Sequence, residues 1–252
     1  MINVLFSAFI FSCTITACLI SCGNTSEKTV SINKNIKIIE LANVNAYLVR
    51  LKNGYVLIDT GFPDQWDKLE NELKVAGCLP GTLKLVILTH GDFDHSGNCA
   101  KLQEKYKVKI AMDRGDSDMV EKGIRRNRQV RTLMGRFIMF MSKLKGGARS
   151  FATFKPDIYL TDGQDLKAYD FDAEIIHLPG HTRGSIGILT GDGDLFIGDT
   201  IFNFTKPEYS IFIENNDELK VSFKKLKKLK AKTVYPGHGK PFPMEEVLKI
   251  DM

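Results

Sequence analysis

The segment from Leu83 to His95 constrains the fold of this chain more than any other. Its apolar run LKLVILT (83–89) contains β-branched residues and is typical of a strand that is buried on both faces. The polar sequence HGDFDH (90–95) follows directly. Four imidazole and carboxylate side chains within six residues destabilise a folded loop through desolvation and like-charge repulsion unless a cation compensates them. We therefore predict a metal-binding loop at the end of a buried strand.

The same pattern recurs at three later places in the chain. PGHT (179–182), GDT (198–200) and PGHG (236–239) each follow an apolar run. In each, a glycine precedes the His or Asp, so the backbone can approach its neighbours closely while the side chain projects from a strand end. These segments add His181, Asp199 and His238 to the candidate ligands, and such ligands suit zinc, iron or manganese. The fifth histidine, His177, lies within a predicted strand and is interpreted as a core or supporting residue.

The rest of the pattern predicts two groups of strands, each followed by helices. We expect strands over 36–41, 45–51, 54–60, 83–89, 108–112, 158–160, 173–178, 185–190 and 194–198, and helices over 64–76, 96–106 and 217–231. The runs LIDT (57–60) and FIGDT (196–200) both end an apolar strand with Asp-Thr. This similarity favours two related halves that pack sheet to sheet.

In this order and with these separations, the motifs HGDFDH, PGHT, GDT and PGHG resemble those of the metallo-β-lactamase superfamily of hydrolases. The resemblance covers about residues 36–245. It implies an α/β fold, the four-layer αβ/βα sandwich, with two divalent metal ions at the sheet edges. The ligands that it implies are His90, Asp92 and His181 for one ion, Asp94, His95 and His238 for the other, and Asp199 as a bridge.

The chain departs from the usual family pattern at position 92, where Asp stands in place of His. A carboxylate there can still bind a metal but adds negative charge and hardness, which tilts the preference toward manganese or iron. We expect zinc, with manganese or iron as the alternatives that Asp92 opens. Water between two cations has its pKa lowered and becomes the nucleophile, which Asp94 would orient and deprotonate. The residues expected to hold the ligands by hydrogen bonds are Asp59, Thr89 and Thr200.

The resemblance implies a hydrolase that cleaves an ester, thioester, lactone or amide bond of a small-molecule substrate. PGHT followed by GDT resembles the glyoxalase II-like and lactonase-like branches of the family. No Gly-Arg pair follows Asp199, however, so a glutathione thioester is not favoured. Three alternatives stay open: a phosphodiesterase or nuclease of the same fold, a diiron redox protein, and a non-catalytic metal-binding protein.

The net charge of +5 has a local origin. Residues 122–149 carry nine of the 35 Lys and Arg residues and none of the 30 Asp and Glu residues, which leaves 26 basic against 30 acidic residues elsewhere. We predict that 113–150 is a helical, amphipathic segment near the active-site mouth. It is interpreted as a lid that selects an anionic substrate or as a helix on the membrane surface. Nucleic-acid binding is not favoured, because no known binding module is recognisable.

Residues 1–22 contain no charged side chain and are mostly apolar, which indicates a signal peptide or a membrane anchor. LISC (19–22) followed by Gly23 resembles the bacterial lipoprotein signal, in which Cys22 would be lipidated. The first basic residues lie after the apolar run, so an uncleaved anchor is the alternative. We expect a membrane-attached protein in which a polar tether (23–35) leads into the hydrolase domain (36–252), most simply an extracytoplasmic lipoprotein.

Overall fold

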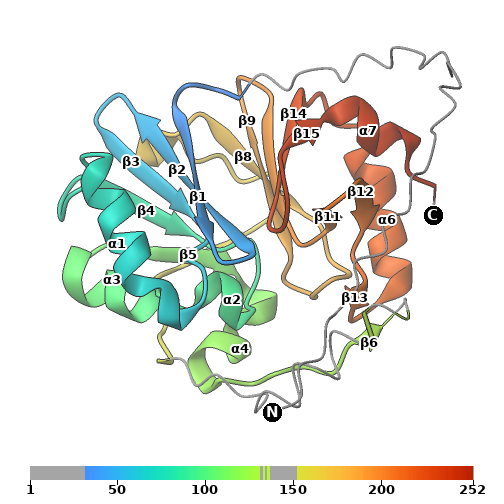
Figure 1. Ribbon diagram of the computed structural model, residues 1–252, viewed down its shortest axis with the longest axis horizontal. Helices are drawn as coiled ribbons and strands as arrows, with labels where there is room; N and C mark the ends of the chain where they lie inside the picture. Colours follow the sequence, from blue (N-terminus) through green and yellow to red (C-terminus); the bar gives the residue numbers. More distant parts are fainter. Residues whose placement is uncertain (1–31, 131–132, 134, 137–151, 252) are drawn as a thin grey trace, which may run out of the picture.

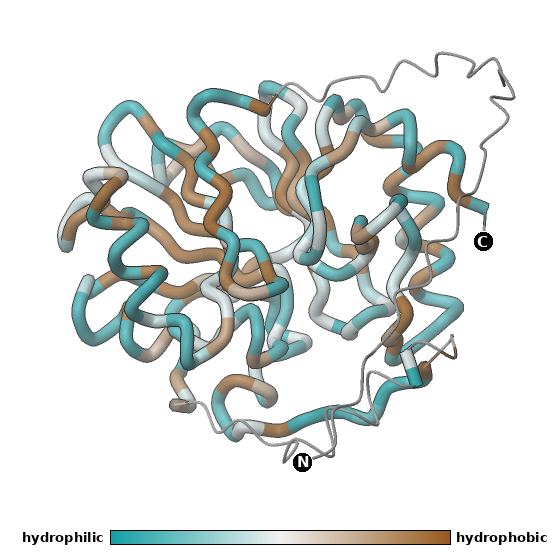
Figure 2. The backbone as a smooth tube through the Cα atoms, in the orientation of Figure 1, coloured by the Kyte–Doolittle hydropathy of each residue, from teal (hydrophilic) through white to brown (hydrophobic). Residues whose placement is uncertain are grey.

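The apolar runs of the sequence form two β-sheets that pack face to face, with helices on both outer faces (Figure 1). The computed structural model describes residues 32–130, 133, 135–136 and 152–251. Figure 2 shows that the strands at the centre are largely hydrophobic, whereas the outer faces of the helices are hydrophilic. This is the four-layer αβ/βα sandwich expected from the sequence.

The first sheet has the strand order β1-β2-β3-β4-β5-β7. Its strands are β1 (Ile36–Leu41), β2 (Val44–Leu51), β3 (Gly54–Ile58), β4 (Leu83–Ile87), β5 (Ile110–Asp113) and β7 (Ile158–Leu160). The strands from β3 to β7 are parallel, whereas β1, β2 and β3 pair antiparallel. The carboxyl ends of β3 and β4 therefore lie at the same edge of this sheet.

The second sheet has the order β15-β14-β10-β9-β8. Its strands are β8 (Ala173–His177), β9 (Ile186–Thr190), β10 (Asp194–Gly198), β14 (Thr233–Pro236) and β15 (Phe242–Pro243). The strands β10 and β14 are parallel neighbours, so their carboxyl ends, with the GDT and PGHG segments, lie side by side. Two short ribbons complete the strands: β11 (Ile201–Asn203) with β12 (Pro207–Tyr209), and β6 (Gln129–Val130) with β13 (Phe212–Ile213).

Apolar side chains fill the space between each pair of layers. Leu69 of α1 (Trp66–Val75) and Leu102 of α3 (Cys99–Tyr106) belong to the core against the first sheet. Phe196 and Tyr235 belong to the core between the sheets, where their rings stack with centroids 4.8 Å apart. Phe223 of α6 (Asn216–Leu226) packs in the third core, to which α7 (Met244–Lys249) also contributes. The remaining helices are short: η1 (Pro63–Gln65), α2 (Phe93–Ser96), η2 (Arg114–Asp116), α4 (Ser117–Lys122) and η3 (Lys167–Tyr169).

Most predicted elements are present, and the differences lie at their ends. The strand predicted over 54–60 ends at Ile58 because Asp59 takes a left-handed conformation, with φ of 58°. The strand over 83–89 likewise ends at Ile87, and the helix over 96–106 is replaced by α2 and α3. The helix over 217–231 ends at Leu226.

The prediction that 113–150 is helical is wrong for residues 123–130. The helix α4 ends at Gly123, which has φ of 64°, and β6 then pairs with β13. The physical reason lies in two ion pairs: Arg126 bonds to Asp116, and Arg128 bonds to Asp92. These contacts hold the backbone around the two arginines in an irregular, non-helical conformation. Residues 131–132, 134 and 137–150 of this segment lie outside the described residues.

The N-terminal predictions stay predictions, because residues 1–31 lie outside the described part of the chain. They comprise the signal peptide or anchor over 1–22, lipidation of Cys22 and most of the tether over 23–35. Among the described residues, no helix has both the length and the apolar character needed to cross a membrane.

Candidate metal centre

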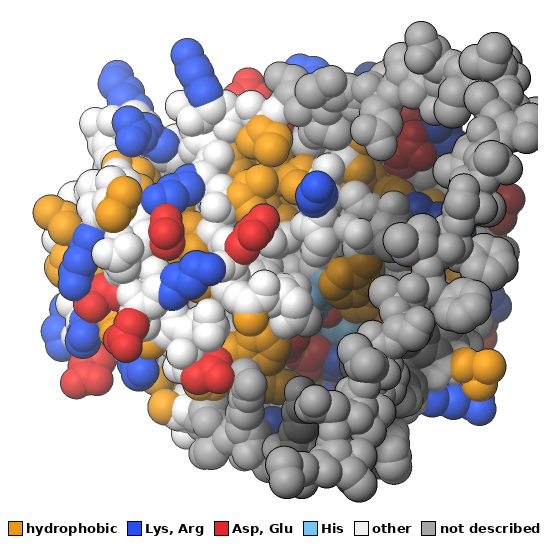
Figure 3. All heavy atoms as spheres, viewed as in Figure 1, with side chains coloured by type: hydrophobic (Ala, Val, Ile, Leu, Met, Phe, Trp, Pro, Cys, Tyr) orange, Lys and Arg blue, Asp and Glu red, His pale blue; other side chains and the backbone are white. Residues whose placement is uncertain are grey.

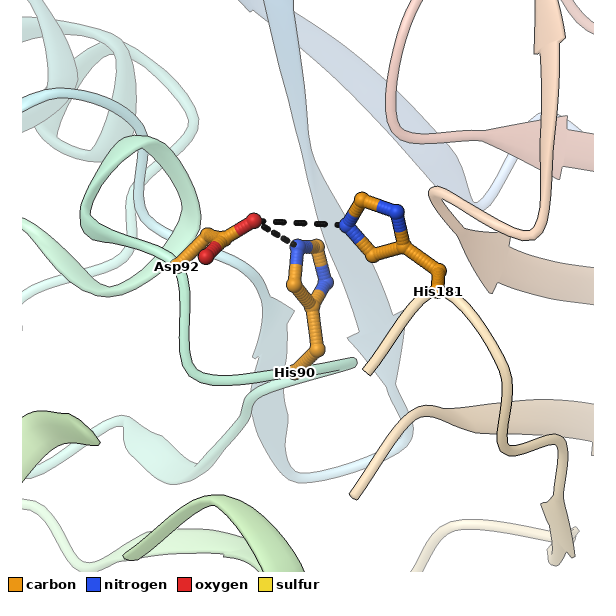
Figure 4. A group of neighbouring side chains, drawn as sticks. All are labelled: His90, Asp92 and His181. Atoms are coloured by element: carbon orange, nitrogen blue, oxygen red, sulfur yellow. Dashed lines mark hydrogen bonds and ion pairs between the residues drawn. The ribbon is translucent and has the colours of Figure 1, made fainter. Parts of the chain in front are cut away.

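His90, Asp92 and His181 form a cluster that we call the first triad. His90 and Asp92 follow β4, whereas His181 lies in the loop between β8 and β9. The Oδ2 atom of Asp92 lies 3.3 Å from the Nε2 atoms of both histidines. Figure 4 shows this carboxylate oxygen facing both rings. The two halves of the chain thus contribute to one ligand set, as predicted.

Asp94, His95 and His238 form a second cluster, called the second triad below. Asp94 and His95 belong to the short helix α2, and His238 follows β14. Each residue offers one ligand atom within 4.8 Å of the others, and Nε2 of His238 lies 3.6 Å from Oδ2 of Asp94. The centroids of the His90 and His95 rings are 4.1 Å apart, so the two triads are adjacent.

Asp199 lies between the two triads. It follows β10, and its Oδ1 atom lies 3.2 Å from Nε2 of His95. Its Oδ2 atom lies 3.3 Å from Nε2 of His238 and 3.6 Å from Nε2 of His181. One carboxylate therefore faces histidines of both triads, which is the geometry needed to bridge two ions. All seven ligand candidates of the sequence meet at one place.

Asp59 and Thr89 orient two of the histidines. Asp59 accepts hydrogen bonds from Nδ1 of His95 at 2.9 Å, and from the backbone N–H and the hydroxyl of Thr89, both at 2.8 Å. Because the Thr89 hydroxyl donates to Asp59, it accepts from Nδ1 of His90, at 3.0 Å. Both rings consequently present the Nε2 lone pair to the site. Thr200 does not share this role, since its buried hydroxyl has no hydrogen-bond partner among the described residues.

The other two histidines are oriented by backbone carbonyl groups. Nδ1 of His181 donates to the carbonyl of Phe212 at 2.6 Å and lies 2.9 Å from the hydroxyl of Ser210. Nδ1 of His238 donates to the carbonyl of Asn43 at 2.6 Å. A backbone carbonyl carries no side-chain signal, so these partners could not be predicted from the sequence.

The site has a strongly negative field on the side of the second triad. Burial acts to lower the pKa of His238, but Asp199 and Asp94 outweigh it and raise that pKa to about 10. Burial likewise opposes the effect of Asp199 and Asp59 on His95, whose pKa is nevertheless raised. The histidines in turn hold the pKa of Asp199 well below its usual range, against the effect of burial. Such a field attracts cations.

The residues present fit a pair of metal ions. Nε2 of His90, Nε2 of His95 and Oδ1 of Asp199 are buried and have no hydrogen-bond partner among the described residues, although His90 lies 3.3 Å from Asp92 and His95 lies 3.2 Å from Asp199. Buried nitrogen and oxygen lone pairs without hydrogen bonds are costly, and a cation can accept all of them at once. Imidazole and carboxylate ligands suit zinc, iron and manganese alike, so the donor set does not identify the metal.

Asp116 is a supporting residue that the sequence did not reveal. Its Oδ2 atom accepts hydrogen bonds from the backbone N–H of Gly91 at 3.0 Å and from the hydroxyl of Thr182 at 2.6 Å. It thereby joins the loop of the first triad's His90 to that of His181. Asp116 lies in η2, distant in sequence from every motif, and its importance comes only from its burial and its partners.

The basic segment reaches the site through two arginines. Arg126 forms ion pairs with Asp116 and Asp118, and Arg128 bonds to Asp92 of the first triad. The prediction placed this segment near the active-site mouth, and the contact with Asp92 agrees with that placement.

His177 lies outside both triads. It is half-exposed, and its Nε2 atom bonds to the carbonyl of Arg183, so the interpretation as a core residue is wrong.

Apolar side chains border the second triad. Phe202 and Phe204 lie with ring centroids 5.1 and 5.8 Å from that of His238, and Phe204 is 61% exposed. Figure 3 shows histidine atoms at the base of a hollow with hydrophobic side chains beside them. The site therefore offers an apolar surface next to the candidate ligands.

Residues 39–238 match the sequence profile of the Metallo-beta-lactamase superfamily. The chain belongs to the metallo-β-lactamase superfamily. This membership classes the chain as a metallo-hydrolase and agrees with the arrangement of the two triads. It also confirms the family expected from the four motifs.

Similar members of the superfamily include two curated proteins and one solved structure. The hydroxyacylglutathione hydrolase GloC of Haemophilus influenzae is 29% identical over 142 residues, which is 53% of this chain and 60% of GloC, so the match spans about three-fifths of that protein. The acyl-coenzyme A thioesterase MBLAC2 of Gallus gallus is 26% identical over 220 residues, covering 82% of this chain and 76% of MBLAC2. TTHA1623, solved in a di-iron-bound form, is 26% identical with a TM-score of 0.63, covering 85% and 96% of the two chains.

Proposed function

We propose that this chain is a metal-dependent hydrolase of acyl thioesters. The observation that carries the proposal is that Asp199 faces histidines of both ligand triads, beside the apolar rings of Phe202 and Phe204. Two similar proteins, GloC and MBLAC2, carry names of enzymes that act on thioesters. This support favours a thioester over the ester, lactone and amide alternatives.

The side chains of this chain divide the chemistry between them. When bound, two ions would polarise the substrate carbonyl and lower the pKa of the attacking water. Asp94 lies beside His238 at the edge of the second triad, where it can orient that water and accept its proton. Asp59 and Thr89 keep two histidine rings in the tautomer that presents Nε2. Residues that are not themselves metal ligands thus fix the orientation of the ligands.

The wall beside the second triad favours a substrate with an apolar acyl group. Phe204 exposes most of its ring next to His238 and can cover an acyl chain. The residues that follow Asp199 read TIFNFTKPEYS and contain no Gly-Arg pair, so a glutathione carrier is not favoured. We infer that the acyl group, more than the thiol carrier, determines recognition.

A substrate panel tests the proposal. The metal-loaded chain would be assayed on acetyl-CoA, octanoyl-CoA, S-lactoylglutathione, a homoserine lactone, a β-lactam and bis(p-nitrophenyl) phosphate. We expect the highest kcat/KM on octanoyl-CoA and its loss in His238→Ala. His177→Ala is the matched control, because it removes the one histidine outside both triads. Faster cleavage of the phosphodiester would instead favour a phosphodiesterase, and background rates on the whole panel would favour a non-catalytic metal-binding protein.

Metal content decides between hydrolysis and redox chemistry. We propose zinc as the resident metal, with iron or manganese as alternatives because of Asp92. TTHA1623 was solved in a di-iron-bound form. Elemental analysis of the protein purified from its native source would identify the metal, and iron accompanied by oxygen consumption would support the diiron redox alternative.

A further inference from the structure

Arg128 is held against the first triad by the same ribbon that orients His181. The strand β6 pairs with β13 so that Val130 lies opposite Phe212. The carbonyl of Phe212 accepts the Nδ1 proton of His181. Arg128 immediately precedes β6, and its side chain is only 13% exposed. Its position is therefore built into the fold and is not that of a surface side chain.

The guanidinium of Arg128 uses two of its nitrogens on Asp92. Nη1 donates to Oδ2 of Asp92, and Nη2 donates to Oδ1 at 2.6 Å. Nη1 also lies 3.3 Å from Nε2 of His181. A two-point arginine–carboxylate contact is strong and geometrically specific. A single nitrogen of Arg128 thus contacts two of the three ligand atoms of the first triad.

The charges of the two triads differ as a result. In the first triad, the positive charge of Arg128 offsets the negative charge of Asp92. At the second triad, Asp94 lies against His238, and Asp199, which also faces His181 at 3.6 Å, lies closer to His95 and His238, at 3.2 and 3.3 Å. A divalent ion gains more attraction at the second triad, whereas at the first it must compete with a cation that belongs to the chain.

We propose that Arg128 competes with metal for Asp92, so that the second triad loads first and the first triad loads only when the guanidinium leaves the carboxylate. Arg128 then sets the metal stoichiometry of the protein at a given metal concentration. This inference rests on the proposed metal centre but is independent of the hydrolytic reaction.

A titration of metal binding tests the inference. The full chain, stripped by a chelator, would be titrated with Zn²⁺ by calorimetry and by competition with a chromophoric chelator. We expect one tight and one weaker binding event in the wild type, the weaker absent in His181→Ala and the tight one absent in His238→Ala. Arg128→Met should strengthen the weaker event by about 10- to 100-fold, the range over which groups bonded to metal ligands tune affinity, and leave the tight event unchanged.

Lys122→Met is the matched control, because it removes one positive charge from the exposed end of α4 in the same segment. It should leave both events unchanged. Two events of equal affinity in the wild type, or no strengthening in Arg128→Met, would overturn the inference while leaving the metal centre intact. Absence of both events would instead overturn the proposed function. If Arg128→Met does not fold, Arg128→Lys is the second variant, because it retains the charge without the two-point contact. It should strengthen the weaker binding event to a smaller extent. An unchanged affinity in Arg128→Lys would contradict the inference.

Discussion

At the scale of single residues, each of the four histidines of the centre binds a neighbour through Nδ1 and turns Nε2 toward the others. For His95 the neighbour is Asp59, and for His90 it is Thr89, which itself bonds to Asp59. One buried carboxylate therefore orients a histidine of each triad. Asp59 also adopts a positive φ, a conformation that few residues other than glycine accept without strain.

Replacing Asp59 by Asn should weaken metal binding at both triads. An amide has one acceptor oxygen in place of two, so it cannot serve Nδ1 of His95 and both donors of Thr89 in the same way. We expect an affinity loss of about 10- to 100-fold, measured by competition with a chelator. Thr200→Val is the control: it removes a hydroxyl that has no hydrogen-bond partner in the part of the chain that the structure describes, so metal affinity should not change. Equal losses in the two variants would contradict the role given to Asp59.

The ligands and their orienting residues differ in how far the sequence could reveal them. His90, Asp199 and the other ligands follow apolar runs, so strand topology alone brings them to one edge. Arg128 lies in a segment whose apolar residues are spaced as in a helix. Its partner Asp92 is 36 residues earlier in the chain, and no local pattern connects the two.

At the scale of elements, glycines let the loops of the two sheets approach one another. A Cβ atom at Gly237 would lie 2.3 Å from Oδ1 of Asp199 and 2.7 Å from Cε1 of His95. A Cβ atom at Gly198 would lie 2.4 Å from the hydroxyl of Thr89. The sequence predicted this close approach from the Gly-His and Gly-Asp pairs. It could not show which atoms would meet.

Gly237→Ala should lower metal affinity, because the added methyl group displaces Asp199 or His95. Gly81→Ala is the control: its Cβ would meet nothing within 4 Å, and only its positive φ of 88° opposes the substitution. We expect Gly81→Ala to lower the free energy of unfolding by about 1 kcal/mol with unchanged metal affinity. Chelator competition and urea unfolding separate the two effects. Unchanged metal affinity in Gly237→Ala would show that the site tolerates the methyl group.

The ion pair between Asp118 of α4 and Arg183, in the loop after His181, should weaken in acid. Burial acts to raise the pKa of Asp118, but its hydrogen bond to Arg126 and the charges of Arg126 and Arg183 outweigh burial and lower it. A carboxyl group whose pKa is lower in the folded state stabilises the fold above its unfolded pKa, about 3.9, and loses that contribution as the pH falls through the folded value. Urea unfolding of the metal-free protein at pH 7 and pH 3 should therefore show a smaller loss of stability in Asp118→Asn than in the wild type. Equal losses would assign the acid sensitivity to other carboxylates.

At the scale of the whole molecule, two halves of the chain each build one sheet and one layer of helices. The repeated Asp-Thr ending predicted this division. In the structure, both of these aspartates contact the His95 ring: Asp59 lies 2.9 Å from Nδ1, and Asp199 lies 3.2 Å from Nε2. The basic segment was the part least open to prediction, because long-range ion pairs of Arg126 and Arg128 override its helical pattern.

The position of the whole molecule in the cell depends on residues 1–22, and we propose that they attach the protein to a membrane. The uncharged apolar run and the LISC sequence motivate this proposal. Mass spectrometry of the protein from its native membrane fraction should find a lipid on an N-terminal Cys22. An unmodified Met1 in that fraction would favour an uncleaved anchor, and recovery of the protein only from the soluble fraction would contradict both forms of attachment.

The division of the ligands between the two halves also bears on how the protein matures. Each triad takes two ligands from the first half and one from the second, and His238 follows β14 of the second sheet. During synthesis, the first half can form its sheet early, yet neither triad is complete until the second sheet has docked. A metal ion would therefore bind with its full ligand set only after the two sheets have docked, when the long-range contacts, the slowest to form, are in place.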